Sequence, residues 1–296
     1  MRVASIGECM VELRERPDGT LTRGFGGDTL NTAVYLARLG IPVDYVTALG
    51  DDAWSDEMLA AWGAEGVSTG FVQRLPSRLP GLYIIQTDAK GERRFSYWRD
   101  SAAARRLFDH IEPDALDPFD LVYVSGITLS IYDPPSREKL FAMLDRVQNR
   151  GGRVAFDTNF RPRGWPDKAV AAELYTRMFR SADIVLASVE DLTLLHGEVG
   201  EAELLRHAVG KEIVLKLDQP ACRVLHEETE AMVEAAPVSN VVDTTAAGDS
   251  FAAAYLASRL RGVPPKEAAR AGHDLAGIVV GHPGAIVPRE ATGAVR

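Results

Sequence analysis

Residues 243–252 read Asp-Thr-Thr-Ala-Ala-Gly-Asp-Ser-Phe-Ala, and they open a segment whose apolar residues recur at helical spacing. The first amides of a helix have no partner within the helix, and small side chains let a bulky anion approach them. The carboxylate of Asp249 beside such an anion suits a base that takes a hydroxyl proton while the amides of Ala246, Ala247 and Gly248 hold a phosphoryl group. The alternative is an ordinary helix start, in which an early Asp favours the helix dipole.

A second glycine-rich stretch, Gly-Phe-Gly-Gly-Asp-Thr-Leu-Asn at 24–31, precedes another helical pattern. Together the two stretches resemble the paired signatures of the ribokinase-like (PfkB) carbohydrate kinases, and the resemblance covers essentially the whole chain. It implies that Asp249 is the base and that the amides before it form the anion hole. The implied sugar contacts of this stretch are Gly26, Gly27 and Asn31. Ala246 stands where the family usually has a glycine, which narrows the backbone angles available there.

The composition predicts a cytoplasmic protein whose partners are small molecules. A formal net charge of −9 over 296 residues argues against nucleic acid or anionic membranes as partners. The two cysteines, Cys9 and Cys222, show no metal-binding spacing. The first residues read as a strand and not as a signal peptide, and no apolar run approaches the length of a membrane span.

Short β-rich runs alternate with helical ones, which predicts parallel strands joined by crossover helices. With the resemblance, this implies an α/β fold over 1–296: a single ribokinase-like domain with a three-layer α/β/α core, a mainly parallel sheet and a small β-sheet lid. The expected core strands are 3–6, 43–48, 121–125, 153–156, 184–187 and 212–216. The expected helices are 29–39, 53–65, 134–150, 167–180, 201–209, 247–261 and 265–280.

The lid is expected from about 11–25 and 81–103. Residues 82–99 read as a β-hairpin whose turn, 88–91, contains a glycine. Ribokinase-like enzymes carry such a sheet over the sugar and often use it as a dimer contact. The resemblance therefore implies a homo-oligomer, with a dimer formed through the lid.

Two arginines are candidates for binding a carboxylate. On a strand, Tyr97 and Arg99 share one face, and an arginine beside an aromatic ring can hold a carboxylate through two hydrogen bonds. The alternative, which spacing alone favours, is a solvated arginine that protects an edge strand. Arg161 follows another strand at the sheet edge where open α/β sheets bind ligands, so on physical grounds it is the better candidate.

Several segments resemble the 2-keto-3-deoxygluconate kinases within that family. They are residues 7–10, 25–32, 79–83, 97–99, 157–161, 243–251 and 284–290. The implied substrate contacts are Gly27, Tyr83, Tyr97, Arg99 and Arg161, with the arginines at the carboxylate end. The implied reaction is ATP-dependent phosphorylation of 2-keto-3-deoxygluconate at its terminal hydroxyl, giving the 6-phosphate. The alternatives are a fructokinase or another sugar kinase of the family, and a sugar-acid-binding relative without turnover.

The nucleotide signals depart further from the family pattern. Lys216 follows a strand where relatives carry a glycine-containing loop over ATP, but Asp218 and Ala221 replace both glycines. Ser188 and Asp191 stand where the family has Asn-x-x-Glu, which supports the hydration shell of Mg²⁺; the alternative is a helix start capped by Ser188. The resemblance implies ATP and Mg²⁺ as cofactors and leaves a monovalent cation open. The implied contacts are Asn159, Ser188, Lys216 and Gly248 for the nucleotide, and Asp191 for the metal through water.

Overall fold

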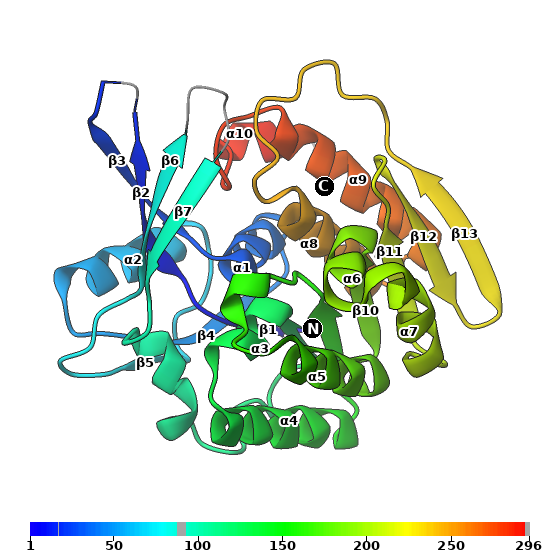
Figure 1. Ribbon diagram of the computed structural model, residues 1–296, viewed down its shortest axis with the longest axis horizontal. Helices are drawn as coiled ribbons and strands as arrows, with labels where there is room; N and C mark the ends of the chain where they lie inside the picture. The colour runs from blue at the N-terminus through cyan, green and yellow to red at the C-terminus, as the bar shows by residue number, and fades with distance from the viewer. Residues whose placement is uncertain (17, 88–92, 294–296) are drawn as a thin grey trace.

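The computed structural model describes residues 1–16, 18–87 and 93–293. Within these residues the strands form two separate sheets (Figure 1). The strands of the larger sheet are β1 (Val3–Ile6), β4 (Val43–Leu49), β5 (Val72–Arg74), β8 (Leu121–Ser125), β9 (Arg153–Asp157), β10 (Ile184–Ser188), β11 (Glu212–Lys216), β12 (Ala221–His226) and β13 (Thr229–Glu234). Their spatial order is β13-β12-β11-β10-β9-β8-β1-β4-β5.

The large sheet is mainly parallel. Every described neighbouring pair from β5 to β11 is parallel, while β12 and β13 add an antiparallel hairpin at one edge. The central strands β1 and β8 are buried along their whole length, which strands covered on both faces require. Along β8, Leu121 and Tyr123 belong to one hydrophobic cluster and Val122 and Val124 to the other, because successive side chains point to opposite faces.

Helices cover both faces of this sheet, which confirms the expected three-layer α/β arrangement. One cluster packs α1, α2, α8 and α9 against one face, and the other packs α3 to α7 against the opposite face. The helices are α1 (Asp28–Arg38), α2 (Ala53–Ala64), α3 (Gly126–Ile131), α4 (Pro134–Asn149), α5 (Lys168–Ser181), α6 (Val189–His196), α7 (Gly200–His207), α8 (Ala247–Leu260), α9 (Pro265–Val280) and α10 (Arg289–Thr292). None of the described helices combines the length and apolar character that crossing a bilayer requires.

The smaller sheet stands apart from the layered core (Figure 1) and corresponds to the expected lid. Its strands are β2 (Met10–Glu15), β3 (Leu21–Gly26), β6 (Leu82–Thr87) and β7 (Arg93–Trp98). The order is β3-β2-β6-β7, and β6 and β7 pair antiparallel, which confirms the hairpin. The predicted turn at 88–91 lies outside the described residues. Where the chain leaves the lid, the Ala103 amide donates to the Leu79 carbonyl at 2.9 Å.

Candidate active site

The start of α8 and the start of α1 meet at Asp249. The side-chain amide of Asn31, on α1, donates to Oδ2 of Asp249 at 2.8 Å, and the hydroxyl of Thr32 donates to the Asp249 carbonyl oxygen at 3.3 Å. Ala246 precedes α8 with a φ of +60°, in the left-handed region. A glycine adopts that conformation without strain, whereas alanine pays about 1 kcal/mol. The chain therefore holds Ala246 in this conformation at a cost in free energy.

Asp249 is electrostatically unusual. Burial raises its pKa to about 8, the nearby charge of Asp28 adds to the effect, and the hydrogen bond from Asn31 opposes it. A carboxyl group with this pKa is poised for proton transfer near neutral pH. No role for Asp28 was predicted from the sequence. Asp28 precedes Asn31 by three residues on α1 and therefore lies on the same face of that helix.

A partly buried lysine lies next to the same helix start. The ammonium group of Lys216, at the end of β11, donates to Oδ2 of Asp157 at 3.1 Å and to Oδ1 at 3.4 Å. A Cβ built on Gly248 would lie 3.6 Å from Lys216 Nζ. Burial raises the pKa of Asp157, and the charge of Lys216 opposes that rise. The structure thus brings the predicted nucleotide residue Lys216 to the first turn of α8.

Asn159 lies against the start of α1. Its side-chain amide donates to Oδ2 of Asp28 at 2.7 Å, and its φ of +27° is unusual for a residue other than glycine. The backbone amide of Asn159 donates to Oδ1 of Asp157 at 3.2 Å. Asn159 therefore links the end of β9 to α1.

Ser188 and Asp191 form a helix cap. The Ser188 hydroxyl accepts a hydrogen bond from the backbone amide of Asp191 at 3.1 Å. This is the bond expected for a helix start capped by Ser188. The Asp191 carboxylate accepts from the Thr158 hydroxyl at 2.7 Å and from Nη1 of Arg161 at 3.4 Å. The Arg161 side chain is 60% exposed, so most of its guanidinium remains open to solvent.

The donor set near Asp191 fits Mg²⁺ only as an ion held largely by water and phosphate. The described residues hold no group of three or more His, Cys, Asp or Glu side chains that could bind a metal directly. Mg²⁺ commonly keeps several waters and is bound through one or two carboxylates together with substrate phosphates. The negative charge of Asp191 is close enough to raise the pKa of Asp157. Together the two residues supply one or two carboxylates for such an ion.

The remaining predicted substrate residues lie where the lid joins the core. The Tyr83 hydroxyl donates a short hydrogen bond to Glu12 of β2, and a Cβ on Gly26 would clash with that hydroxyl. The Arg99 guanidinium lies 5.9 Å from the centre of the Tyr97 ring. Arg99 also forms an ion pair with Glu8. Because Arg99 is paired with a buried carboxylate, it is not the solvated edge-strand arginine that spacing alone favoured.

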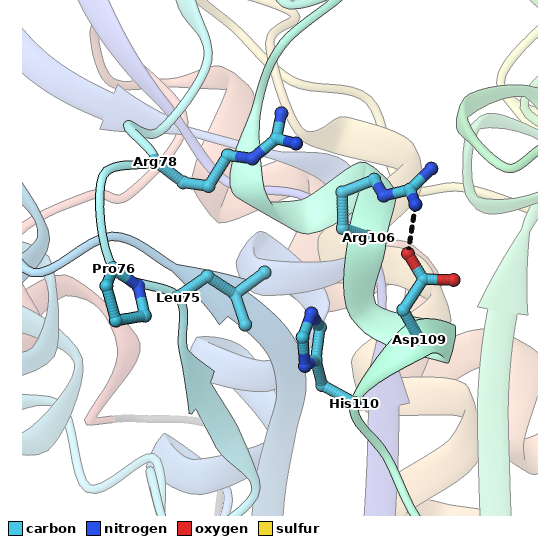
Figure 2. Close-up of a pocket in the computed structure, with 6 residues that line it drawn as sticks. All are labelled: Leu75, Pro76, Arg78, Arg106, Asp109 and His110. Atoms are coloured by element: carbon cyan, nitrogen blue, oxygen red, sulfur yellow. Dashed lines mark ion pairs between the residues drawn. The ribbon is translucent and has the colours of Figure 1, made fainter.

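Figure 2 shows a surface hollow that the sequence analysis did not anticipate. Its volume is about 190 Å³. It is lined by Leu75, Pro76, Arg78, Arg106, Asp109 and His110, and Arg106 pairs with Asp109 at 2.6 Å. None of the predicted site residues lines it, so this hollow is separate from the candidate active site.

Comparisons with known proteins identify the family of the chain. A family model for the pfkB family carbohydrate kinases matches residues 1–292. The 2-dehydro-3-deoxygluconokinases of Dickeya dadantii (strain 3937) and Escherichia coli (strain K12) are each 45% identical over 98% of this chain, covering 97% and 98% of their own lengths. A solved aminoimidazole riboside kinase from Salmonella enterica, complexed with aminoimidazole riboside and an ATP analogue, has a TM-score of 0.85 at 25% identity over 100% of both chains. The chain belongs to the pfkB family of carbohydrate kinases.

Proposed function

We propose that this protein catalyses the ATP-dependent phosphorylation of 2-keto-3-deoxygluconate (2-dehydro-3-deoxygluconate) at its terminal hydroxyl, giving the 6-phosphate. The observation that carries the proposal is the position of Asp249, in the first turn of α8 and hydrogen-bonded to Asn31 at 2.8 Å. The carbonyl oxygen of that Asn31 side chain is buried and has no partner among the described residues. It is an acceptor that a sugar hydroxyl would satisfy. The names of the relatives at 45% identity support the choice of sugar acid.

In this proposal Asp249 takes the proton of the terminal hydroxyl as its oxygen attacks the γ-phosphate of ATP. The amides of Ala246, Ala247 and Gly248 stabilise the charge on the transferring group. Lys216, next to Gly248, adds a positive charge on the same side. Closure of the lid over the sugar excludes water, which otherwise competes as the acceptor.

Substrate recognition in this proposal takes place at the lid and along β9. Gly26, Gly27 and Tyr83 shape the sugar site, and Arg99 and Arg161 receive the carboxylate. Arg161 supports this role because its side chain is 60% exposed. Its hydrogen bonds to the Phe160 carbonyl oxygen at 2.8 Å and to Asp191 at 3.4 Å are both donated by Nη1. Binding energy at the carboxylate end then orients the hydroxyl at the far end.

ATP and Mg²⁺ are proposed as cofactors. Asn159, Ser188, Lys216 and Gly248 would face the nucleotide, and Asp191 would hold Mg²⁺ through water. The ion supplies neutralisation of phosphate charge when it is bound. The solved relative with an ATP analogue supports the nucleotide class.

We also propose that two copies of the chain dimerise through the lid. The support is the set of large apolar side chains that the lid strands and the loop before β6 leave exposed. They are Leu21, Leu79, Tyr97 and Trp98. Leu21 lies on β3, and Tyr97 and Trp98 lie on β7, which are the two edge strands of this sheet. Exposed apolar side chains of this kind can contribute to an interaction surface.

A fructokinase-type activity is the second candidate, because the pairing of Arg99 with Glu8 partly neutralises the arginine. A coupled ADP-release assay with Mg²⁺-ATP separates the two. The acceptors are 2-keto-3-deoxygluconate, its galactonate epimer, fructose and ribose. Preference for the keto-deoxy acids supports the proposal, and preference for fructose replaces it. Absence of turnover with every acceptor would favour a sugar-acid-binding protein instead.

A further inference from the structure

Glu8 lies two residues after the end of β1, next to the residue that precedes β6 of the lid. Its side chain is 1% exposed and pairs with Arg99, whose side chain is 19% exposed. A Cβ on Gly81 would come 2.7 Å from Oε1 of Glu8 and 3.2 Å from Cβ of Arg99, and a Cβ on Gly27 would clash with the Glu8 carbonyl oxygen. Both the backbone and the side chain of Glu8 are therefore closely surrounded, whereas Arg99 keeps some exposure to solvent.

The ion pair leaves hydrogen-bonding capacity unused. Nη2 of Arg99 donates to Oε2 of Glu8, while Nε of Arg99 and Oε1 of Glu8 are buried and have no partner among the described residues. A guanidinium has five N–H donors in a rigid plane. When Glu8 accepts from only one nitrogen of the guanidinium, donors on its other side stay available, and a carboxylate is the acceptor whose geometry matches them.

The positive charges near Glu8 offset part of the cost of burying its carboxylate. Burial raises the pKa of Glu8, the positive charges of Arg99 and Arg105 oppose that rise, and the negative charge of Asp28 adds to it. Arg105 therefore places a second positive charge near the pair. A carboxylate that approaches Arg99 meets the positive charges of Arg99 and Arg105 and the negative charges of Glu8 and Asp28, and Arg105 offsets part of the repulsion from the two acids.

We propose that Glu8 is a positioning residue for carboxylate recognition, which fixes Arg99 from inside the core so that the free donors of Arg99 face the carboxylate of the sugar acid. This inference rests on the proposed function and extends it to a residue that touches no substrate. The competing account is that Glu8 and the substrate compete for the same donors of Arg99. The two accounts predict opposite changes in substrate affinity when the charge of Glu8 is removed.

The test is a double-mutant cycle with Glu8→Gln, Arg99→Gln and the double variant. Each protein is assayed with 2-keto-3-deoxygluconate and with the uncharged carboxamide of that acid. Glu8→Gln should raise the KM for the acid about tenfold, change kcat less than about twofold, and leave the KM for the carboxamide unchanged. In the Arg99→Gln background the same Glu8 change should have no further effect, because Glu8 acts only through Arg99.

The matched control is Glu212→Gln, which breaks a comparably buried pair with Arg259, where the side chains are 5% and 14% exposed. It should lower the melting temperature without changing either KM. A KM for the acid that falls or stays constant in Glu8→Gln overturns the inference, as does full additivity in the cycle. A wild-type enzyme that rejects the acid overturns the proposed function and this inference together, and that result appears before any variant is tested.

Discussion

The Asp249→Asn variant should lose activity and gain stability. Burial, with the charge of Asp28, raises the pKa of Asp249 from its ordinary 3.8 to about 8. Between these values the folded protein keeps a proton that the unfolded chain releases, so the free energy of unfolding falls as the pH rises. This contribution is fully present below pH ~4 and is lost once the pH passes about 8. An asparagine has no such proton to lose, and its amide oxygen still accepts from Asn31.

The size of the gain follows from the same pKa. Each pH unit in the interval costs about 1.4 kcal/mol, which gives an upper limit of about 6 kcal/mol at pH 8. Asp249 is partly exposed to solvent, and solvent screens its charge, so we expect a gain of about 2 to 3 kcal/mol. For a chain of this size that gain raises the melting temperature by about 5 °C.

Thermal unfolding of both proteins from pH 5 to pH 9 measures the effect. The difference in melting temperature should widen up to pH ~8 and then stay constant. Asp157→Asn is the opposing control, because it leaves Lys216 buried without its partner and should destabilise the protein. Parallel curves for wild type and Asp249→Asn, or a less stable variant at pH 8, would refute the reasoning.

Two further predictions concern turnover and a third concerns stability. The value of kcat/KM should rise with pH up to about 8 as Asp249 loses its proton, and Asp28→Asn should move this limb to lower pH in a pH–rate profile, because it removes a negative charge that raises the Asp249 pKa. Lys216→Met should lower kcat at least about tenfold in steady-state assays while the protein stays folded by circular dichroism; unchanged kcat would remove Lys216 from the phosphoryl site. Gly26→Ala should displace the Tyr83 hydroxyl and lower the melting temperature, and a smaller loss in a Tyr83→Phe background would show that the hydroxyl is the obstacle.

The core strands and most helices could be predicted from the sequence because parallel strands buried on both faces read as continuous apolar runs. The structure places β1, β8 and β11 at the expected residues. It adds β5, with three residues too short for a periodic pattern, and the hairpin β12–β13, whose strands follow the altered loop after Lys216. A helix start capped by Ser188 was predicted only as the alternative to a magnesium contact, and the structure adds the extent of that helix, α6, to His196.

The spacing of residues predicted the candidate site mainly where runs of small residues allow a ligand to approach the backbone closely. The start of α8 and the glycines before α1 belong to that class. The pairing of Glu8 with Arg99 spans 91 residues, and no local spacing rule connects two charged side chains so far apart. The effect of Asp28 on Asp249 is likewise hidden, because it depends on how α1 and α8 approach each other in the folded chain.

The hydrogen bond between Ala103 and Leu79 at the base of the lid bears on which changes of sequence this chain can accept. The backbone enters and leaves the β6–β7 segment at one point, where the Ala103 amide meets the Leu79 carbonyl at 2.9 Å. Residues added or removed between these two positions need not shift β5 or β8 in the large sheet. The hairpin also pairs with β2 through β6, so an exchanged segment must keep that pairing. With it kept, exchange of this segment between relatives is a route to new acceptor specificity that leaves the phosphate-binding end of the molecule unchanged.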